Sequence, residues 1–224
     1  MARKKQFGIN DVMHKAMVAF WNHGYNATSL QVLVECMGIN RASLYNTFGD
    51  KYSLFIETLH SYRLVYLNPF FAEKMKVYSP REAILTLFEE ISARVLKGEE
   101  QNGCFMINTA LELSPHDEKV AKIVSQSFAY IEKNVFRKMI ERGQASGEIS
   151  KSVVPIATAR ALLSLFIGLR VLSRSRPEKA LLHSIANQVE RLLPPGDTVA
   201  LPHPISHTLK SQGHKIQPSA ARAL

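Results

Sequence analysis

The segment from Thr28 to Lys51 constrains this chain more than any other part of its sequence. It holds two short stretches with apolar residues at helical spacing, separated by Gly38. In the second stretch, Leu44 and Phe48 lie four residues apart, so they share one face. The first stretch carries its apolar residues three or four apart, at Leu30, Leu33, Val34 and Met37. This pattern predicts two helices joined by a tight turn, which is a helix-turn-helix.

Polar residues stand at the expected starts of these helices. Thr28 is suited to cap the first helix, with Gln31 reaching back as its capping-box partner. Asn40 is suited to cap the second helix, and Asp50 a third that begins at Lys51. The helix before them, of about fourteen residues, is predicted to start at a cap on Asn10.

The exposed side of the second helix carries small and polar residues. With Leu44 and Phe48 inward, the outward residues are Arg41, Ala42, Ser43, Tyr45 and Asn46. They combine a guanidinium, hydroxyls and an amide, and the small residues allow a close approach to base edges. Such a surface suits the major groove of double-stranded DNA.

These residues resemble the signature of TetR-type (AcrR-like) helix-turn-helix transcriptional repressors. The resemblance covers roughly residues 9 to 60, and it rests on a glycine, a hydrophobe and a cap followed by Tyr-x-x-Phe-x-x-Lys. The matching residues are Gly38, Ile39, Asn40, Arg41, Ser43, Leu44, Tyr45, Phe48 and Lys51, with Phe20, Gly24, Tyr25 and Thr28 before them. The sequence departs from the family pattern at Val34 and Met37, where alanine is common.

The resemblance implies a role for each matching residue. Tyr45 and Lys51 would contact the DNA backbone, and Thr28 or Ser29 would offer a hydroxyl at a helix amino terminus to the other side of the groove. Base reading would then fall to Arg41, Ser43 and Asn46, with Arg41 on guanine as the foremost contact.

The remaining chain predicts an all-α body. One helix runs from Tyr52 toward Phe70, and Pro69 is expected to kink or end it. Five further helices are predicted at 81–97, 104–113, 116–144, 154–173 and 177–192. The expected organisation is a three-helix DNA-binding domain at 1–51, a helical effector-binding and dimerisation domain at 52–193, and a disordered tail at 194–224.

The last two predicted helices carry a surplus of apolar residues. The first of them is apolar around most of its circumference, at Ile156, Ala159, Ala161, Leu162, Leu165, Phe166, Leu169 and Leu172. The second has a stripe at Leu181, Leu182, Ile185, Val189 and Leu192. One core-facing side does not need so many. By the resemblance, the two helices pair with their copies in a four-helix bundle of a homodimer.

Aromatic and sulfur-containing residues in the body suggest an effector pocket. The candidates are Tyr62, Tyr66, Phe70, Phe88, Cys104, Met106, Phe128 and Phe166. A cavity among them would take an apolar or aromatic small molecule, whereas the alternative is that they form the core. Cys104 begins a helix, where amides stabilise a thiolate and make it reactive; the alternative is that it acts as a small buried hydrophobe.

Composition limits the other classes of function. The net charge of +9 is spread over the chain, because residues 1–66 hold seven lysines and arginines against four acidic residues. We expect no signal peptide, and no metal or cofactor motif or catalytic pair is recognisable. Arg160 and Arg170 interrupt the most apolar stretch, so no membrane span is expected. We expect a cytoplasmic protein. The alternative is a small helical enzyme or interaction module in which residues 28–48 only pack.

Overall fold

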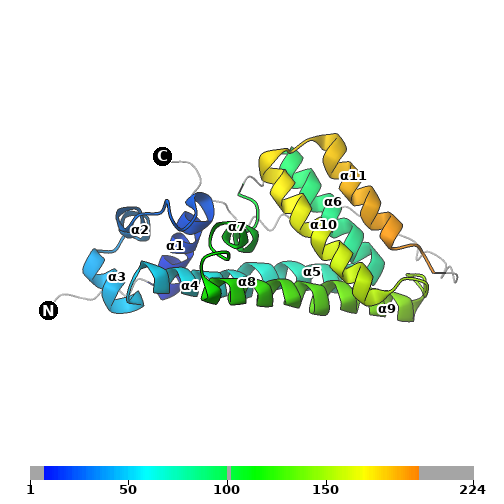
Figure 1. Ribbon diagram of the computed structural model, residues 1–224, viewed down its shortest axis with the longest axis horizontal. Coiled ribbons are helices and arrows are strands. Elements are labelled where there is room, and N and C mark those ends of the chain that lie inside the picture. Colours follow the sequence, from blue (N-terminus) through cyan, green and yellow to red (C-terminus); the bar gives the residue numbers. More distant parts are fainter. Residues whose placement is uncertain (1–7, 100–101, 197–224) are drawn as a thin grey trace.

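The computed structural model describes residues 8–99 and 102–196, and within these ranges the chain forms helices and no strand (Figure 1). The amino-terminal domain contains α1 Ile9–His23, α2 Leu30–Met37 and α3 Arg41–Phe48. The body contains α4 Lys51–Tyr62, η1 Arg63–Leu67, α5 Asn68–Val77, α6 Pro80–Leu96, α7 Phe105–Glu112, α8 Glu118–Tyr130, η2 Ile131–Arg137, α9 Lys138–Ser146, α10 Pro155–Ser175 and α11 Lys179–Leu192. The all-α prediction is confirmed. Most of the predicted tail, residues 197–224, lies outside the described residues.

Three of the predicted features at helix ends are present as expected. The Asn40 side chain accepts from the Ser43 amide at 2.8 Å, and Asp50 accepts from the Ser53 amide at 2.6 Å. Gly38 ends α2 in the left-handed region, with φ of 68°. The hydrogen bond from Ser53 stabilises the carboxylate, so the pKa of Asp50 lies below its ordinary value.

Two predicted caps are wrong. The first helix begins at Ile9 and has no side-chain cap, so Asn10 lies inside its first turn. The cap of α2 is Ser29, whose hydroxyl accepts from the Val32 amide at 3.2 Å. Gln31 does not reach back, because its amide is bonded to Glu35 in the next turn at 2.6 Å.

A helix of unusual length joins the two halves of the molecule. α4, η1 and α5 follow one another without a break from Lys51 to Val77, so of the predicted kink or end at Pro69, the end is wrong. The π-helical turns of η1 lie directly before the proline, and the Asn68 amide bonds to the Arg63 carbonyl five residues back. A π-type segment therefore accommodates the missing amide of Pro69 without ending the helix.

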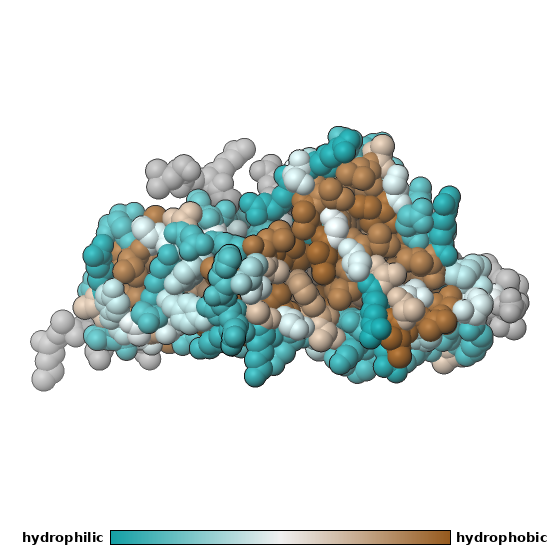
Figure 2. All heavy atoms as spheres, viewed as in Figure 1, coloured by the Kyte–Doolittle hydropathy of each residue, from teal (hydrophilic) through white to brown (hydrophobic). Residues whose placement is uncertain are grey.

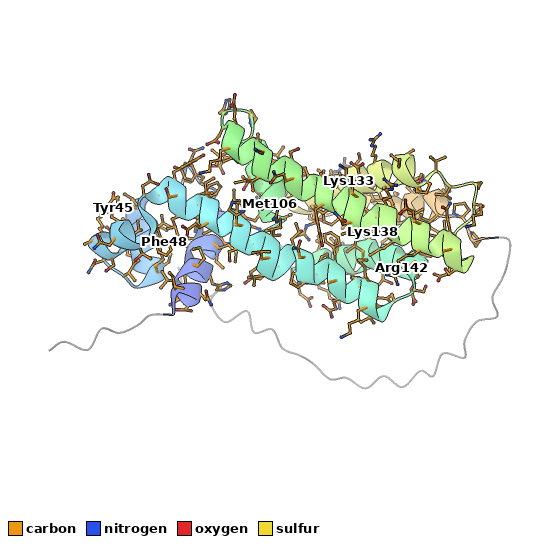
Figure 3. All side chains as sticks on the ribbon, turned by 90° about the horizontal axis from the view of Figure 1, so that it is seen from below. Tyr45, Phe48, Met106, Lys133, Lys138 and Arg142 are labelled. Atoms are coloured by element: carbon orange, nitrogen blue, oxygen red, sulfur yellow. The ribbon has the colours of Figure 1, made fainter. Side chains whose placement is uncertain are left out.

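The body is built around two long helices that lie side by side, with a second layer over one end (Figures 1 and 3). One is α4–η1–α5, and the other is α8–η2–α9, which spans Glu118 to Ser146 as the sequence predicted for 116–144. α6, α10 and α11 form the second layer (Figure 1). Where the two layers pack, four phenylalanine rings, two from each layer, meet with centroids 5.7 to 6.5 Å apart: Phe71, Phe88, Phe136 and Phe166.

The helix α10 is apolar on more than its core-facing side. Residues such as Phe166 and Leu169 face the core, yet Ile156 remains 43% exposed. Apolar surface is concentrated over the end of the molecule that holds α10 and α11 (Figure 2). Among the described residues, α10 alone is long and apolar enough to cross a bilayer by length and composition. Its Arg170 is buried in the protein and donates to the Gly103 carbonyl.

Candidate nucleic-acid interface

The helix α3 stands at the end of the molecule with its polar side uncovered. Leu44 and Phe48 are buried against the rest of the domain, as predicted. The predicted contact residues of α3 are all exposed, namely Arg41, Ala42, Ser43, Tyr45 and Asn46. Tyr45 lies at the tip of the molecule, far from α9 (Figure 3). α3 therefore offers a row of hydrogen-bond donors and acceptors that no other described residue covers.

The Arg41 guanidinium is only weakly held. Among the described residues it donates to the Gln31 amide oxygen, at 3.5 Å, which is the long limit of a hydrogen bond. Gln31 in turn donates to Glu35 at 2.6 Å. The five-donor fork of Arg41 is thus free to leave Gln31 for a stronger acceptor, such as the two acceptors of a guanine edge.

The sequence predicted that Thr28 or Ser29 offers a hydroxyl to DNA, and these two residues differ in burial. Thr28 is fully buried, and its hydroxyl donates to the Gly24 carbonyl at 2.5 Å. It therefore stabilises the turn between α1 and α2, and its hydroxyl is not available to DNA. Ser29 is exposed at the amino terminus of α2, where free amides and the helix dipole favour a phosphate.

Lys51 is half-buried in the first turn of α4. Its ammonium lies 4.3 Å from the centre of the Tyr25 ring. Burial lowers the pKa of Lys51, and the nearby Glu112 carboxylate acts in the opposite direction. The ring contact keeps the ammonium beside the turn that leads into α2, and a phosphate contact by Lys51 remains a prediction.

One functional candidate gave no signal in the sequence. Glu112, at the end of α7, accepts hydrogen bonds from the backbone amides of Tyr25 and Asn26, 87 and 86 residues away. Such long-range pairing of a carboxylate with main-chain donors follows from tertiary structure and has no local pattern.

The predicted pocket residues fall into separate packed groups. Tyr62 stacks on Tyr66 with ring centroids 5.8 Å apart and donates to the Cys104 sulfur at 3.5 Å. Phe88 and Phe166 belong to the phenylalanine core, and Phe70 joins it through Phe71 at 5.3 Å. Met106 is fully buried, and Phe128 is half-buried against the core. The set does not surround one space, so the structure favours the alternative that most of these residues are core.

A hollow on the surface of the body has a different lining. It is an open depression of about 380 Å³ beside η1 and η2. Its residues are Arg63, Asn68, Gln126, Ala129, Tyr130, Lys133 and Asn134. None of the predicted pocket residues is among them, and the groups present are mainly amides and cations.

Cys104 occupies the cap position of α7, as the sequence predicted, yet its side chain is only 3% exposed. The neighbouring Tyr62 has a pKa well above the ordinary value of a tyrosine, because burial and then the proximity of Cys104 disfavour a phenolate. Cys36 is exposed on α2, and burial of part of its side chain raises the pKa of its thiol.

These environments predict the order of thiol labelling. Under native conditions N-ethylmaleimide should modify Cys36 about tenfold or more faster than Cys104, because access requires local opening around Cys104. Mass spectrometry of peptides from timed samples measures both rates, and labelling in urea supplies the control in which both react. Comparable native rates would show that the Cys104 environment opens readily, which the packed geometry does not predict.

Comparisons with known proteins agree with this geometry. Residues 12–58 match the family model described as bacterial regulatory proteins, tetR family, and residues 80–188 match the LmrA/YxaF-like transcriptional regulator C-terminal domain. The chain is 34% identical over 152 residues to the uncharacterized HTH-type transcriptional regulator YezE of Bacillus subtilis, covering 66% of this chain and 78% of that one. It is 32% identical to the HTH-type transcriptional repressor ComR of Escherichia coli, over 86% of this chain and 91% of that one.

A solved structure extends the likeness to a DNA complex. A cysteine-substituted form of the TetR-family regulator CifR, bound to a 26-base-pair operator, superposes with a TM-score of 0.74 and 28% identity. The match covers 86% of this chain and all of that one. Both halves of the chain, the exposed reading helix and the helical body, thus have their counterparts in one kind of protein. The chain belongs to the TetR family of DNA-binding transcriptional regulators.

Proposed function

We propose that the protein is a dimeric repressor that binds a palindromic operator and leaves it when an effector binds. The observation that carries the proposal is α3, which buries only Leu44 and Phe48 and exposes the rest of its length at the tip of the molecule. ComR is named a transcriptional repressor, and CifR is seen on operator DNA, so relatives of similar sequence support the same activity.

On DNA, α3 would lie in the major groove. Arg41, Ser43 and Asn46 would read base edges, while the small Ala42 allows the helix to come close. Tyr45 and Lys51 would contact phosphates on one strand, and Ser29 with the α2 amino terminus would contact the other. The phosphate contacts set the position of the helix, and the base contacts supply specificity.

A palindromic operator has two half-sites, so it requires two copies of the DNA-binding domain α1 to α3, which we call the reading head. The apolar surface over α10 and α11 is the side on which a second copy would pack, forming a four-helix bundle across a two-fold axis. This pairing would hold the two α3 helices about 34 Å apart, or one turn of DNA.

Release by an effector would act through α4–η1–α5, because this helix begins in the DNA-binding domain and ends in the body. The hollow beside η1 is lined by Arg63, Lys133 and amide side chains, so it suits a polar or anionic molecule. The apolar effector suggested by the sequence would need a cavity to open within the aromatic core. Thermal-shift screening with matched apolar and anionic aromatic compounds distinguishes these two sites.

We place this activity in the cytoplasm, where bacterial operators are found, and we assign the protein no enzymatic reaction. The test of the whole proposal is a gel shift with DNA flanking the gene of the protein, titrated with salt. Tight binding to a palindrome supports the proposal, with affinity falling steeply as salt rises. Weak binding that ignores sequence would contradict it and favour a helical module in which residues 28–48 only pack.

Two substitutions on α3 should impair DNA binding in different ways. Arg41→Ala should cost about 1 to 3 kcal/mol at one base position and relax specificity there, since a bidentate donor to guanine is lost. Tyr45→Phe removes one hydroxyl that reaches phosphate, so it should weaken binding to all sequences by a similar factor. Selection from a randomised operator library, followed by sequencing, measures both profiles. An unchanged profile for Arg41→Ala would show that Arg41 reads no base.

A further inference from the structure

The turn between α1 and α2 is held by a carboxylate from the body. Both oxygens of Glu112 are engaged: Oε2 accepts from the Tyr25 amide at 3.0 Å, and Oε1 from the Asn26 amide at 2.8 Å. These two amides lie outside any helix, so they have no partner in regular secondary structure. A charged acceptor makes such bonds about twice as strong as those between neutral groups.

The turn is shaped to admit this carboxylate. Gly24 has φ of 82°, and a Cβ at this position would lie 2.7 Å from Glu112 Oε2, closer than any side chain could tolerate. On the other side, the Thr28 hydroxyl donates to the Gly24 carbonyl. The turn is thus fixed from two sides, and Ser29, the cap of α2, follows it directly.

The other end of α7 is fixed to the body. The Gly103 carbonyl, just before the helix, accepts from Arg170 of α10, and Cys104 accepts from Tyr62 of α4. The loop before α7 also contacts the DNA-binding domain, because the Asn102 carbonyl accepts from the Trp21 ring nitrogen of α1 at 3.1 Å. In Figure 1, α7 lies between the helix-turn-helix and the layer of α6 and α10. It therefore connects α10, on the proposed dimer side, to the turn that begins the reading head.

We infer that Glu112 is the positioning residue that sets the angle of the reading head on the body. The inference rests on the proposed binding of a dimer to a palindrome. With Glu112 in place, the two reading helices of a dimer are held at one separation, so operators of one half-site spacing bind best. Without it, α4 still joins the two parts and α1 still packs against α4, so the head stays attached but takes a wider range of angles.

The test is Glu112→Gln in the full-length protein. Glutamine keeps the size and one acceptor oxygen, but its amide group presents a donor to a backbone donor. The probes are the palindrome found by gel shift, versions with the half-site spacing changed by one and two base pairs, and a duplex with one half-site. We expect about tenfold weaker binding to the native palindrome, a flattened dependence on spacing, and unchanged binding to the single half-site.

Two controls separate positioning from simple loss of stability. Glu118→Gln makes the same charge change on exposed α8 and should leave the spacing profile as in the wild type. Gly24→Ala should flatten the profile by displacing the carboxylate, whereas Gly38→Ala should not, since φ is also positive there but nothing lies within 4 Å of the added Cβ.

The outcomes are distinct. A wild-type spacing profile for Glu112→Gln overturns the inference. So does a parallel loss on the palindrome and the single half-site together with a lower Tm, because that pattern indicates only a structural role. If the wild-type protein itself does not prefer any palindrome over scrambled DNA, the proposed function fails, and the inference fails with it.

Discussion

Replacing Gly168 with glutamate is expected to make the protein a monomer at micromolar concentration. Gly168 lies in the middle of α10, two residues from the core-facing Phe166, which places it about 200° around the helix and away from the core. A Cβ there meets nothing within 4 Å, so the position borders open space in the single chain. A glutamate side chain would project straight onto the surface where we propose that the second copy packs.

The size of the effect follows from the chemistry of a closed interface. Each copy would bury one unpaired carboxylate, at a cost of several kcal/mol. A loss of about 2.7 kcal/mol already weakens a dimer 100-fold. Sedimentation at several protein concentrations should show a monomer, and binding to the palindrome should fall to that of a single half-site, since the two reading heads are no longer linked.

Two controls make the result specific to this surface. Gly168→Ala keeps the surface nearly flat and removes a helix-interior glycine, which costs about 1 kcal/mol relative to alanine, so it should preserve the dimer and raise stability. Ser125→Glu adds the same charge on exposed α8 and should leave the dimer intact. A Gly168→Glu protein that remains a dimer would place the interface elsewhere.

The sequence predicted what local chemistry determines. The caps at Asn40 and Asp50, the stop at Gly38 and the inward pair Leu44 and Phe48 are all present, because each depends on neighbours three or four residues away. Where two polar residues adjoin, local chemistry does not decide between them. Thr28 and Ser29 both suit a cap, and tertiary packing buries Thr28 and leaves the role to Ser29.

Contacts between residues far apart in the chain could not be predicted from the sequence. The bonds of Glu112 to Tyr25 and Asn26 cross 86 residues or more, and no periodicity marks them. The helix continues past Pro69 because of the π-helical turns before it, and no pattern in the sequence predicts such turns. The predicted pocket stays a prediction for another reason. A core and an apolar cavity draw on the same aromatic residues, so composition does not tell them apart.

Phe88 decides between these two interpretations, and Phe88→Ala is expected to destabilise the body by about 3 to 5 kcal/mol. The side chain is fully buried, with its ring centroid 6.2 Å from that of Phe136 and 6.5 Å from that of Phe166. Removing it deletes two of the five ring contacts in the phenylalanine core. Urea unfolding at fixed protein concentration measures the loss, since the stability of a dimer depends on concentration.

A pocket residue would behave differently, and Phe70 supplies the comparison. Phe70 is only half-buried and contacts the core through Phe71, so Phe70→Ala should cost roughly 1 to 2 kcal/mol. The space left by Phe88→Ala is closed and apolar, so benzene should raise the Tm of that variant and leave the wild type unchanged. A loss below about 1 kcal/mol for Phe88→Ala, with no response to benzene, would mean that Phe88 already borders open space and that the effector pocket lies within the aromatic core after all.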